Sequence, residues 1–233
     1  MATRPVFIPS NSDELLVESI EVEFDWSPGL AVSQKQKSIS ALHNQAERRG
    51  LSALLEVSSK SLSYHGSNYS AFNLKIEHGT VGYIPVECAF QGSKRFTNGG
   101  PYTDLLLANP KDAKRDERLK TSGLLEGFEF EGTFWDLVPQ TAFYDFIYLQ
   151  SLSNNQQLIK ELMKYKGFTD IEFNPKKSIN CQARSCALAV ALEERGDLRY
   201  VLQNKNLFIT YLSEHGYGKS KPSLGGQTSL RLG

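Results

Sequence analysis

The stretch PVECAFQGSKRFTNGGPYTDLLLANPKDAKRDER, residues 85–118, has a pattern that predicts two short helices joined by a glycine-rich turn. Glu87, Gln91 and Lys94 lie at i, i+4 and i+7, which places a carboxylate, an amide and an ammonium on one helix face. Apolar residues cover much of the remaining circumference, so we expect the helix to be packed on those sides. Its polar face is then either solvated or the wall of a pocket.

The second helix of this stretch has a recognisable start. Asn109 can cap it, Pro110 suits the first helical position, and Asp112 lies in the first turn. A basic stripe follows, made of Lys111, Lys114, Arg115 and Arg118. Such a stripe is usually a solvated face. Beside a buried carboxylate it can instead hold phosphate, because lysine and arginine donate charge-assisted hydrogen bonds to phosphate oxygens.

The segments VECAFQGSKRF, NPKDAKRDERLK and TFWDL together resemble the NADAR family, whose members have an E-x-x-x-Q-x-x-K helix followed by an A-K-R helix. Longer strings resemble one subgroup, the NADAR antitoxins encoded beside DarT-type DNA ADP-ribosyltransferase toxins. These strings are RPVFIPS, FDWSPGLAVSQKQKSISALH, EVSSKS, VECAFQGSKRFTNGGPYTDL and FTDIEFNPKKSINCQARSCAL. The resemblance covers residues 4–195.

Composition limits the classes of protein to consider. A chain of 233 residues that is 40% hydrophobic can bury a sizeable core as one domain. The formal net charge is zero, so phosphate binding must rely on local basic patches. The three cysteines form no disulfide framework or zinc motif, and we expect neither a metal nor a cofactor. No apolar run approaches about twenty residues, which predicts a cytoplasmic protein without a membrane partner.

We expect an α+β fold that is predominantly helical and of the NADAR type, with a small β-sheet formed by an N-terminal extension. Residues 20–26 alternate apolar and acidic side chains, which predicts a strand with one buried face, and residues 33–49 predict a helix. The predicted divisions are 1–57 for the extension packed on the core, 58–195 for the catalytic core, 196–215 for a C-terminal helical segment, and 216–233 for a disordered tail.

Two further segments are candidates for binding. Residues 58–70 form a long loop without apolar periodicity, which favours a binding role. The resemblance places this region at the entrance to the pocket and implies ligand contacts for Ser59, Lys60, Ser70 and Asn73. Later in the chain, FTDIEFNPKK predicts a strand with Asp170, Glu172 and Asn174 on its polar face.

From the residues alone we infer a pocket lined by Glu87, by cations of the second helix, and by the acids at 170–172. Such a pocket suits hydrolysis of a glycosidic bond in a nucleotide that bears phosphates. Departure of the leaving group from a ribose creates an oxocarbenium-like cation, which a carboxylate stabilises while a carboxylate base activates water.

The NADAR resemblance implies a more definite reaction, cleavage of the N-glycosidic bond between ADP-ribose and guanine in DNA. It implies that Glu87 is the catalytic glutamate and that Asp170 or Glu172 is the later acid, with Asp170 preferred. Trp135 matches the tryptophan of the family, which makes it a third candidate catalytic residue; it is either a core residue or an aromatic face for a base or ribose. The expected substrate-binding residues are Gln91, Lys94, Lys114, Arg115, Ser59, Lys60, Asn73, Glu172 and Asn174.

The expected partners are ADP-ribosylated DNA, ADP-ribose as the product, and the cognate DarT-type toxin. Two alternatives stay open at this stage. The same pocket residues could serve an N-glycosidase for phosphorylated intermediates of riboflavin synthesis. The chain could also be a non-enzymatic antitoxin that binds ADP-ribose or sequesters its toxin.

Overall fold

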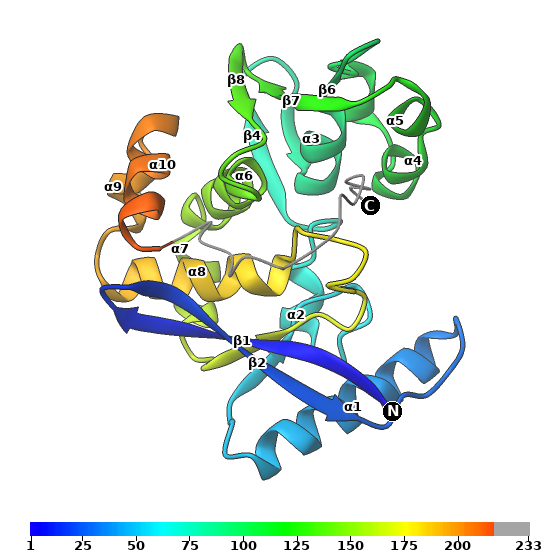
Figure 1. Cartoon of the computed structure of the whole chain (residues 1–233), viewed down its shortest axis with the longest axis vertical. Coiled ribbons are helices and arrows are strands. Elements are labelled where there is room, and N and C mark those ends of the chain that lie inside the picture. Colours follow the sequence, from blue (N-terminus) through cyan, green and yellow to red (C-terminus); the bar gives the residue numbers. More distant parts are fainter. Residues whose placement is uncertain (217–233) are drawn as a thin grey trace, which may run out of the picture.

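A computed structural model describes residues 1–216 and shows a mixed α+β protein (Figure 1). Helix accounts for 42% and strand for 23% of the structure, so the expectation of a predominantly helical fold is not confirmed. The strands form a four-stranded, a three-stranded and a two-stranded sheet. The sequence underestimated the strand content because several strands are only three or four residues long and carry no measurable alternation.

The four-stranded sheet has the order β2-β1-β9-β3, and its strands are β1 (Ala2–Ser12), β2 (Leu15–Phe24), β9 (Gly167–Thr169) and β3 (Leu54–Glu56). Strands β1 and β2 form a long antiparallel pair, as the alternation predicted for β2. Strand β9 pairs with β1 at Phe7 and Phe168, and it runs parallel to β3. We expected a small sheet formed by the N-terminal extension alone. The observed sheet also includes β9, a strand from much later in the chain.

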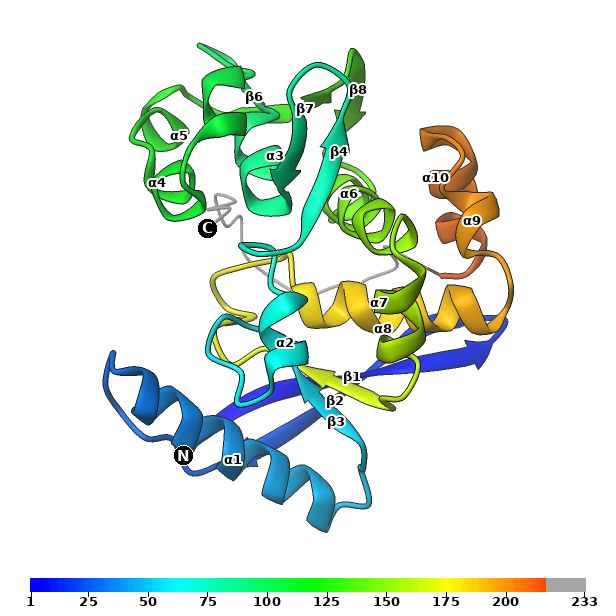
Figure 2. The same cartoon turned by 180° about the vertical axis from the view of Figure 1, so that it is seen from behind.

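Helices cover both faces of this sheet. Helix α1 (Val32–Arg48) packs Ile39, Leu42 and Ala46 against Val22 and Phe24, which confirms the predicted helix at this position. Helix α8 (Gln182–Glu194) crosses the other face (Figure 2). Because most of α8 is buried, it forms the centre of the molecule between the sheet and the remaining helices.

The part of the molecule around residues 85–118 differs from the two helices predicted there. The hairpin β4 (Lys75–His78) and β5 (Gly82–Pro85) leads into α3 (Val86–Gly92), and the chain then enters β6 (Lys94–Phe96). The predicted helical position of Lys94 is therefore wrong, because β6 pairs Lys94 with Phe128 of the next strand. Elements η1 (Thr103–Leu107), α4 (Pro110–Arg115) and α5 (Arg118–Thr121) follow.

Gly92 ends α3 at a close contact with η1. A Cβ atom at this position would lie 2.9 Å from Leu106 Cδ2 and 3.1 Å from the Tyr102 carbonyl oxygen. A glycine is therefore required for η1 to approach α3 this closely. The packing of η1 in turn fixes the start of α4, where the Asn109 side chain accepts a hydrogen bond from Lys111 N–H, as predicted for the cap.

The remaining elements complete the core. Strands β7 (Leu125–Phe130) and β8 (Thr133–Asp136) extend the sheet begun by β6, and α6 (Ala142–Ser153) packs against α3 and α8. The other helices are α2 (Tyr64–Asn68), α7 (Gln156–Leu162), α9 (Leu198–Val201) and α10 (Lys205–Glu214). The last two lie in the predicted C-terminal helical segment. The predicted disordered tail, apart from Gly216, lies outside the described residues.

Among residues 1–216, none of the helices combines the length and the apolar character that crossing a lipid bilayer requires.

Candidate active site

A cavity of about 710 Å³ lies where α3, α4, the loop after β3 and the loop after β9 converge. Its lining comes from distant parts of the chain and includes most of the residues that the sequence analysis named as site candidates. The predicted site residues that line it are Ser59, Lys60, Ser70, Asn73, Glu87, Gln91, Lys114, Arg115, Asp170, Glu172 and Asn174. Lys94 and Trp135 do not belong to its lining.

Glu87 lies in the first turn of α3 and is only 5% exposed. Its Oε1 atom accepts a hydrogen bond of 2.8 Å from Gln91 Nε2, and Lys114 Nζ lies 3.8 Å from the same oxygen. The helical spacing of four residues brings the amide to the carboxylate, and α4 brings the ammonium. The carboxylate is thus held at the cavity wall between a neutral donor and a cation.

Gln91 has one atom that the protein leaves unpaired. The side chain is 1% exposed, and its Oε1 has no hydrogen-bond partner within residues 1–216. The Nε2 atom donates to Glu87, and exchanging the two ends of the amide would turn its oxygen toward the carboxylate. A buried acceptor without a partner costs about 1–3 kcal/mol. Gln91 Oε1 is therefore suited to accept a hydrogen bond from a ligand hydroxyl.

Lys94 lies in β6 behind the cavity wall, not on the polar face of α3. The side chain is buried, and its Nζ atom lies 4.9 Å from the centre of the Phe90 ring, over its face. Burial lowers the pKa of Lys94 to about 8; the charge of Glu87 opposes this shift and that of Lys114 adds to it. Lys94 is a buried lysine that interacts electrostatically with Glu87, and it does not line the cavity.

Asp170 follows β9 and supplies the second buried carboxyl group of the cavity. Its Oδ1 atom accepts hydrogen bonds from the backbone N–H groups of Glu172 (3.0 Å) and Phe173 (3.2 Å). Burial is the main reason that the pKa of Asp170 is raised to about 8, and repulsion from Glu56 is the second. This shift favours the protonated form of Asp170.

The strand predicted over residues 169–174 is wrong beyond Thr169, where β9 ends and a loop begins. In this loop the two candidate acids have different surroundings. Asp170 turns into the cavity, whereas Glu172 is 44% exposed and forms an ion pair of 3.3 Å with Lys35. Asn174 Oδ1 accepts a hydrogen bond from Lys176 N–H and shapes the same loop. Of the two acids, Asp170 has the buried environment that changes the chemistry of a carboxyl group.

The chain can be compared with known protein families. The model of the DarT1-associated NADAR antitoxins matches residues 2–222. The chain belongs to this family. The resemblance inferred from the sequence is thereby confirmed. A comparison with curated proteins finds no match.

In this NADAR antitoxin, Trp135 lies in β8 and is 2% exposed. Its ring contacts Phe146 at a centroid distance of 4.7 Å and Phe143 at 5.6 Å, and Lys205 Nζ lies 5.7 Å from its centre. The structure thus places Trp135 in the aromatic core and away from the cavity. Of the two interpretations of this residue, the packing role agrees with its position.

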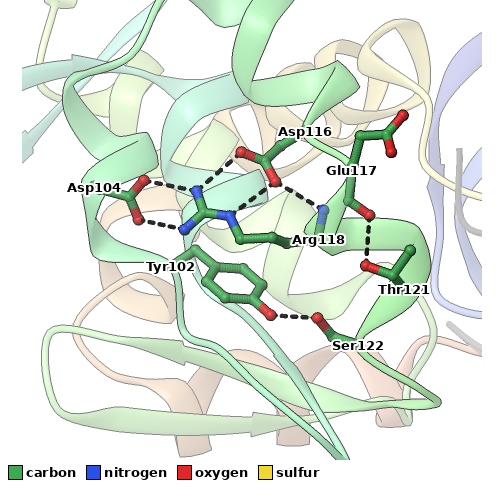
Figure 3. A network of polar contacts seen from close by, with 7 residues as sticks. All are labelled: Tyr102, Asp104, Asp116, Glu117, Arg118, Thr121 and Ser122. Carbon is green, nitrogen blue, oxygen red and sulfur yellow. Dashed lines mark hydrogen bonds and ion pairs between the residues drawn. The ribbon is translucent and has the colours of Figure 1, made fainter.

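Arg118 also departs from the basic stripe predicted for the NADAR antitoxin. Its guanidinium bonds both carboxylate oxygens of Asp104 and those of Asp116, and it lies 4.5 Å from the centre of the Tyr102 ring (Figure 3). These contacts engage the guanidinium and hold η1 to the segment between α4 and α5. Arg118 is therefore a structural residue that supports the placement of Lys114 and Arg115.

Several lining residues of the NADAR antitoxin were not among the expected substrate-binding residues, although one of them, Lys111, belongs to the predicted basic stripe. Tyr144 projects from α6, Gln182 begins α8, and the exposed cations Lys111 and Lys177 lie at the rim. Burial and the nearby charges of Glu87 and Asp170 raise the pKa of Tyr144 well above its ordinary value. The sequence offered a signal only for the lysines, which occur in charged segments. Tyr144 looks like any core aromatic in an apolar helix.

No cluster of three His, Cys, Asp or Glu side chains suited to a metal ion occurs in the described part of the NADAR antitoxin.

Proposed function

We propose that this antitoxin is an ADP-ribosyl glycohydrolase that cleaves the N-glycosidic bond of ADP-ribosylated guanine in DNA. One observation carries the proposal: two buried carboxyl groups, Glu87 and Asp170, share a cavity but have opposite surroundings. Glu87 faces a cation and an amide donor, and Asp170 lies beside another acid. Two carboxyl groups in unlike environments divide the roles of acid and base in glycoside hydrolysis.

The rim of the cavity suits a substrate that carries a pyrophosphate. Its cationic side chains come from the loop after β3, from α4 and from the loop after β9, and they are Lys60, Lys111, Lys114, Arg115 and Lys177. Such donors neutralise phosphate oxygens without a metal ion. The volume of about 710 Å³ lies in the range of cavities that enclose nucleotide-sized ligands. Acids and cations together favour ADP-ribose over an uncharged glycoside.

The reaction follows from these positions. Asp170 donates its proton to the departing guanine, the bond between ribose C1 and nitrogen breaks, and its electron pair stays with the base. The Glu87 carboxylate stabilises the oxocarbenium-like cation and accepts a proton from the water that attacks C1. Gln91 Oε1 accepts a hydrogen bond from a ribose hydroxyl, which satisfies its unpaired oxygen. The products are ADP-ribose and unmodified guanine, and exchange with solvent restores both carboxyl groups.

The substrate must reach the cavity as an extruded or unpaired nucleotide, because a base inside a duplex is not accessible. The family is described as associated with DarT1, which supports DNA modified by that type of toxin as the substrate and the toxin itself as a functional partner. Removal of the adduct restores the DNA and so counteracts the toxin.

The test incubates purified protein with an ADP-ribosylated DNA oligonucleotide and measures released ADP-ribose and restored guanine. We expect Glu87→Gln to lower the rate by roughly a thousandfold, because the neutral amide neither stabilises the cation nor accepts a proton. An unchanged circular dichroism spectrum would show that the fold is retained. Wild-type protein that releases nothing, or a Glu87→Gln protein that still protects cells from the toxin, would contradict the hydrolase and favour an antitoxin that acts by binding.

A further inference from the structure

Glu56, the last residue of β3, is a buried carboxylate that the reaction above does not use. It is 3% exposed and lies outside the lining of the cavity. Its Oε2 atom accepts a hydrogen bond of 2.6 Å from Thr169 Oγ1, and its Oε1 atom accepts one of 2.9 Å from Ile171 N–H. The Ser58 hydroxyl donates to the same carboxylate. Burial raises the pKa of Glu56, and each of these donors opposes that shift by favouring the ionised form.

The partners of Glu56 belong to the two segments that form one wall of the cavity. Thr169 and Ile171 are the residues immediately before and after Asp170. Ser58 begins the loop that places Ser59 and Lys60 in the cavity lining. A single carboxylate therefore binds the residues on both sides of Asp170, through the Thr169 hydroxyl and the Ile171 N–H, and connects them to the loop after β3.

We propose that Glu56 is a positioning residue for Asp170, which it holds in place through Thr169 and Ile171 and whose proton it retains by its own negative charge. This inference rests on the proposed hydrolase function, in which Asp170 is the acid. Removal of an outer partner of this kind reduces activity without altering any group that touches the substrate.

A third residue, His43, fixes the direction of the hydrogen bond between Thr169 and Glu56. His43 Nε2 lies 2.9 Å from Thr169 Oγ1. Because Thr169 gives its hydroxyl proton to Glu56, its oxygen accepts from His43, which therefore has its proton on Nε2. Burial lowers the pKa of His43 to about 4, so the ring is neutral at physiological pH. The chain from His43 through Thr169 to Glu56 thus supplies one defined set of donors.

Charged and titratable groups from several elements face Asp170. Glu56 comes from β3, and its repulsion of Asp170 exceeds that of Glu172 in the loop itself. The other titratable groups coupled to Asp170 are Arg4 from β1, Tyr144 and Tyr148 from α6, and Cys181 and Cys186 at and near the start of α8. Arg4 is the cation of this set, and its charge favours the ionised form of Asp170, whereas the charge of Glu56 favours the protonated form. Of the two acids that raise the pKa of Asp170, Glu56 has the larger effect, and hydrogen bonds from Thr169 and Ile171 hold its carboxylate in place.

The decisive variant is Glu56→Gln, which keeps the shape and an acceptor for Ile171 N–H but removes the charge. We expect kcat at pH 8 to fall roughly tenfold with KM within about twofold, and the alkaline limb of the pH–rate profile to move about one unit lower. Glu23→Gln, an exposed acid of β2 in the same sheet, is the matched control and should leave rate and profile unchanged. A Glu56→Gln enzyme with the wild-type rate and profile would overturn the inference.

A second measurement separates this inference from the proposed function. In protein with ¹³C-labelled aspartate carboxyl groups, the Asp170 signal is assigned by its loss in Asp170→Asn and is titrated in the absence of substrate. We expect Glu56→Gln to move its titration to lower pH by about one unit. If the wild-type protein releases no ADP-ribose, the hydrolase proposal fails, and this titration still decides the role of Glu56. An unmoved titration rejects that role even if the enzyme is active.

Thr169→Val covers the case in which Glu56→Gln does not fold. It removes one donor to Glu56 and leaves the charge in place. We expect kcat to fall about threefold with no change in the alkaline limb, as the loss of a single hydrogen bond implies. Restoration of the rate by Thr169→Ser, which keeps the hydroxyl, would support positioning through the hydrogen bond. A Thr169→Val protein with the wild-type kcat would contradict it.

Discussion

The two walls of the cavity hold the same functional group in opposite surroundings. On one wall, Glu87 lies between Gln91 Nε2 and Lys114 Nζ, with Lys94 buried behind it. On the other, Asp170 is buried beside the charge of Glu56. Burial and the nearby charge of Glu56 raise the pKa of Asp170. In the proposed reaction, the neighbours of each carboxyl group, and not its chemical type, assign the roles of acid and base.

The two walls are also built differently. The Glu87 wall is a helix in which the spacing along the sequence sets the distance between carboxylate and amide. The Asp170 wall is a loop whose geometry depends on the pairing of β9 with β1 and β3 and on Glu56. Changes in the first wall should therefore act directly on the chemistry, and those in the second should act also through the pH dependence.

After the roughly thousandfold loss expected for Glu87→Gln, the largest effect that tests this difference is expected for Asp170→Asn. The amide cannot donate the proton that the leaving base requires, so we expect a rate loss of about a hundredfold or more. In the wild type the rate should fall as pH rises through about 8, the pKa of Asp170, because only the protonated form is active. The variant should lack this alkaline limb. A pH–rate profile with the same limb in both proteins would assign it to another group.

The same variant sharpens the comparison through stability. The folded protein raises the pKa of Asp170 from 3.8 to about 8, so it binds the proton more tightly than the unfolded chain does. The free energy of unfolding should therefore decrease as pH rises between these two values and level off above them. Asp170→Asn should reduce this slope in urea denaturation measured at several pH values. Glu56 is expected to contribute to the slope that remains, because burial raises its pKa as well.

An intermediate effect is expected for Lys114→Met, on the Glu87 wall. The half-exposed ammonium contacts Glu87 and lies at the rim, so its removal should weaken the binding of phosphate and raise KM roughly tenfold. Lys166→Met, at an exposed lysine outside the cavity lining, is the matched control. Measurement of ADP-ribose affinity by calorimetry separates binding from turnover. Equal affinities for the two variants would remove Lys114 from the binding site.

The smallest effect on the rate is expected for Trp135→Phe. Because its ring packs on Phe143 and Phe146 and does not line the cavity, kcat and KM should remain within about twofold. The smaller ring leaves a void, so the free energy of unfolding should decrease by about 1–3 kcal/mol. Denaturant unfolding measures the second effect and steady-state kinetics the first. A large loss of activity at unchanged stability would return Trp135 to the site.

The site residues that the sequence predicted share a local signal. Glu87 and Gln91 lie four residues apart in a helix, and Lys114 and Arg115 follow a capped helix start. Lys94 was misplaced because the helical period was carried past Gly92, the last residue of α3, into β6. In the later segment, the alternation of FTDIEF predicted a strand that includes Asp170, Glu172 and Asn174. The observed strand β9 ends at Thr169, opposite the last residue of its partner β3.

By itself the sequence determined the family, the helix that carries Glu87 and the basic helix beside it, because these features depend on short spacings and on long characteristic strings. Only the tertiary structure decided that Arg118 is engaged by Asp104 and Asp116, that Trp135 is buried, and that Glu56 adjoins Asp170. Glu56 and Asp170 are far apart in the chain and are brought together by the parallel pairing of β3 with β9. Burial and the repulsion between two charges depend on distance in space, and the order of residues does not contain that distance.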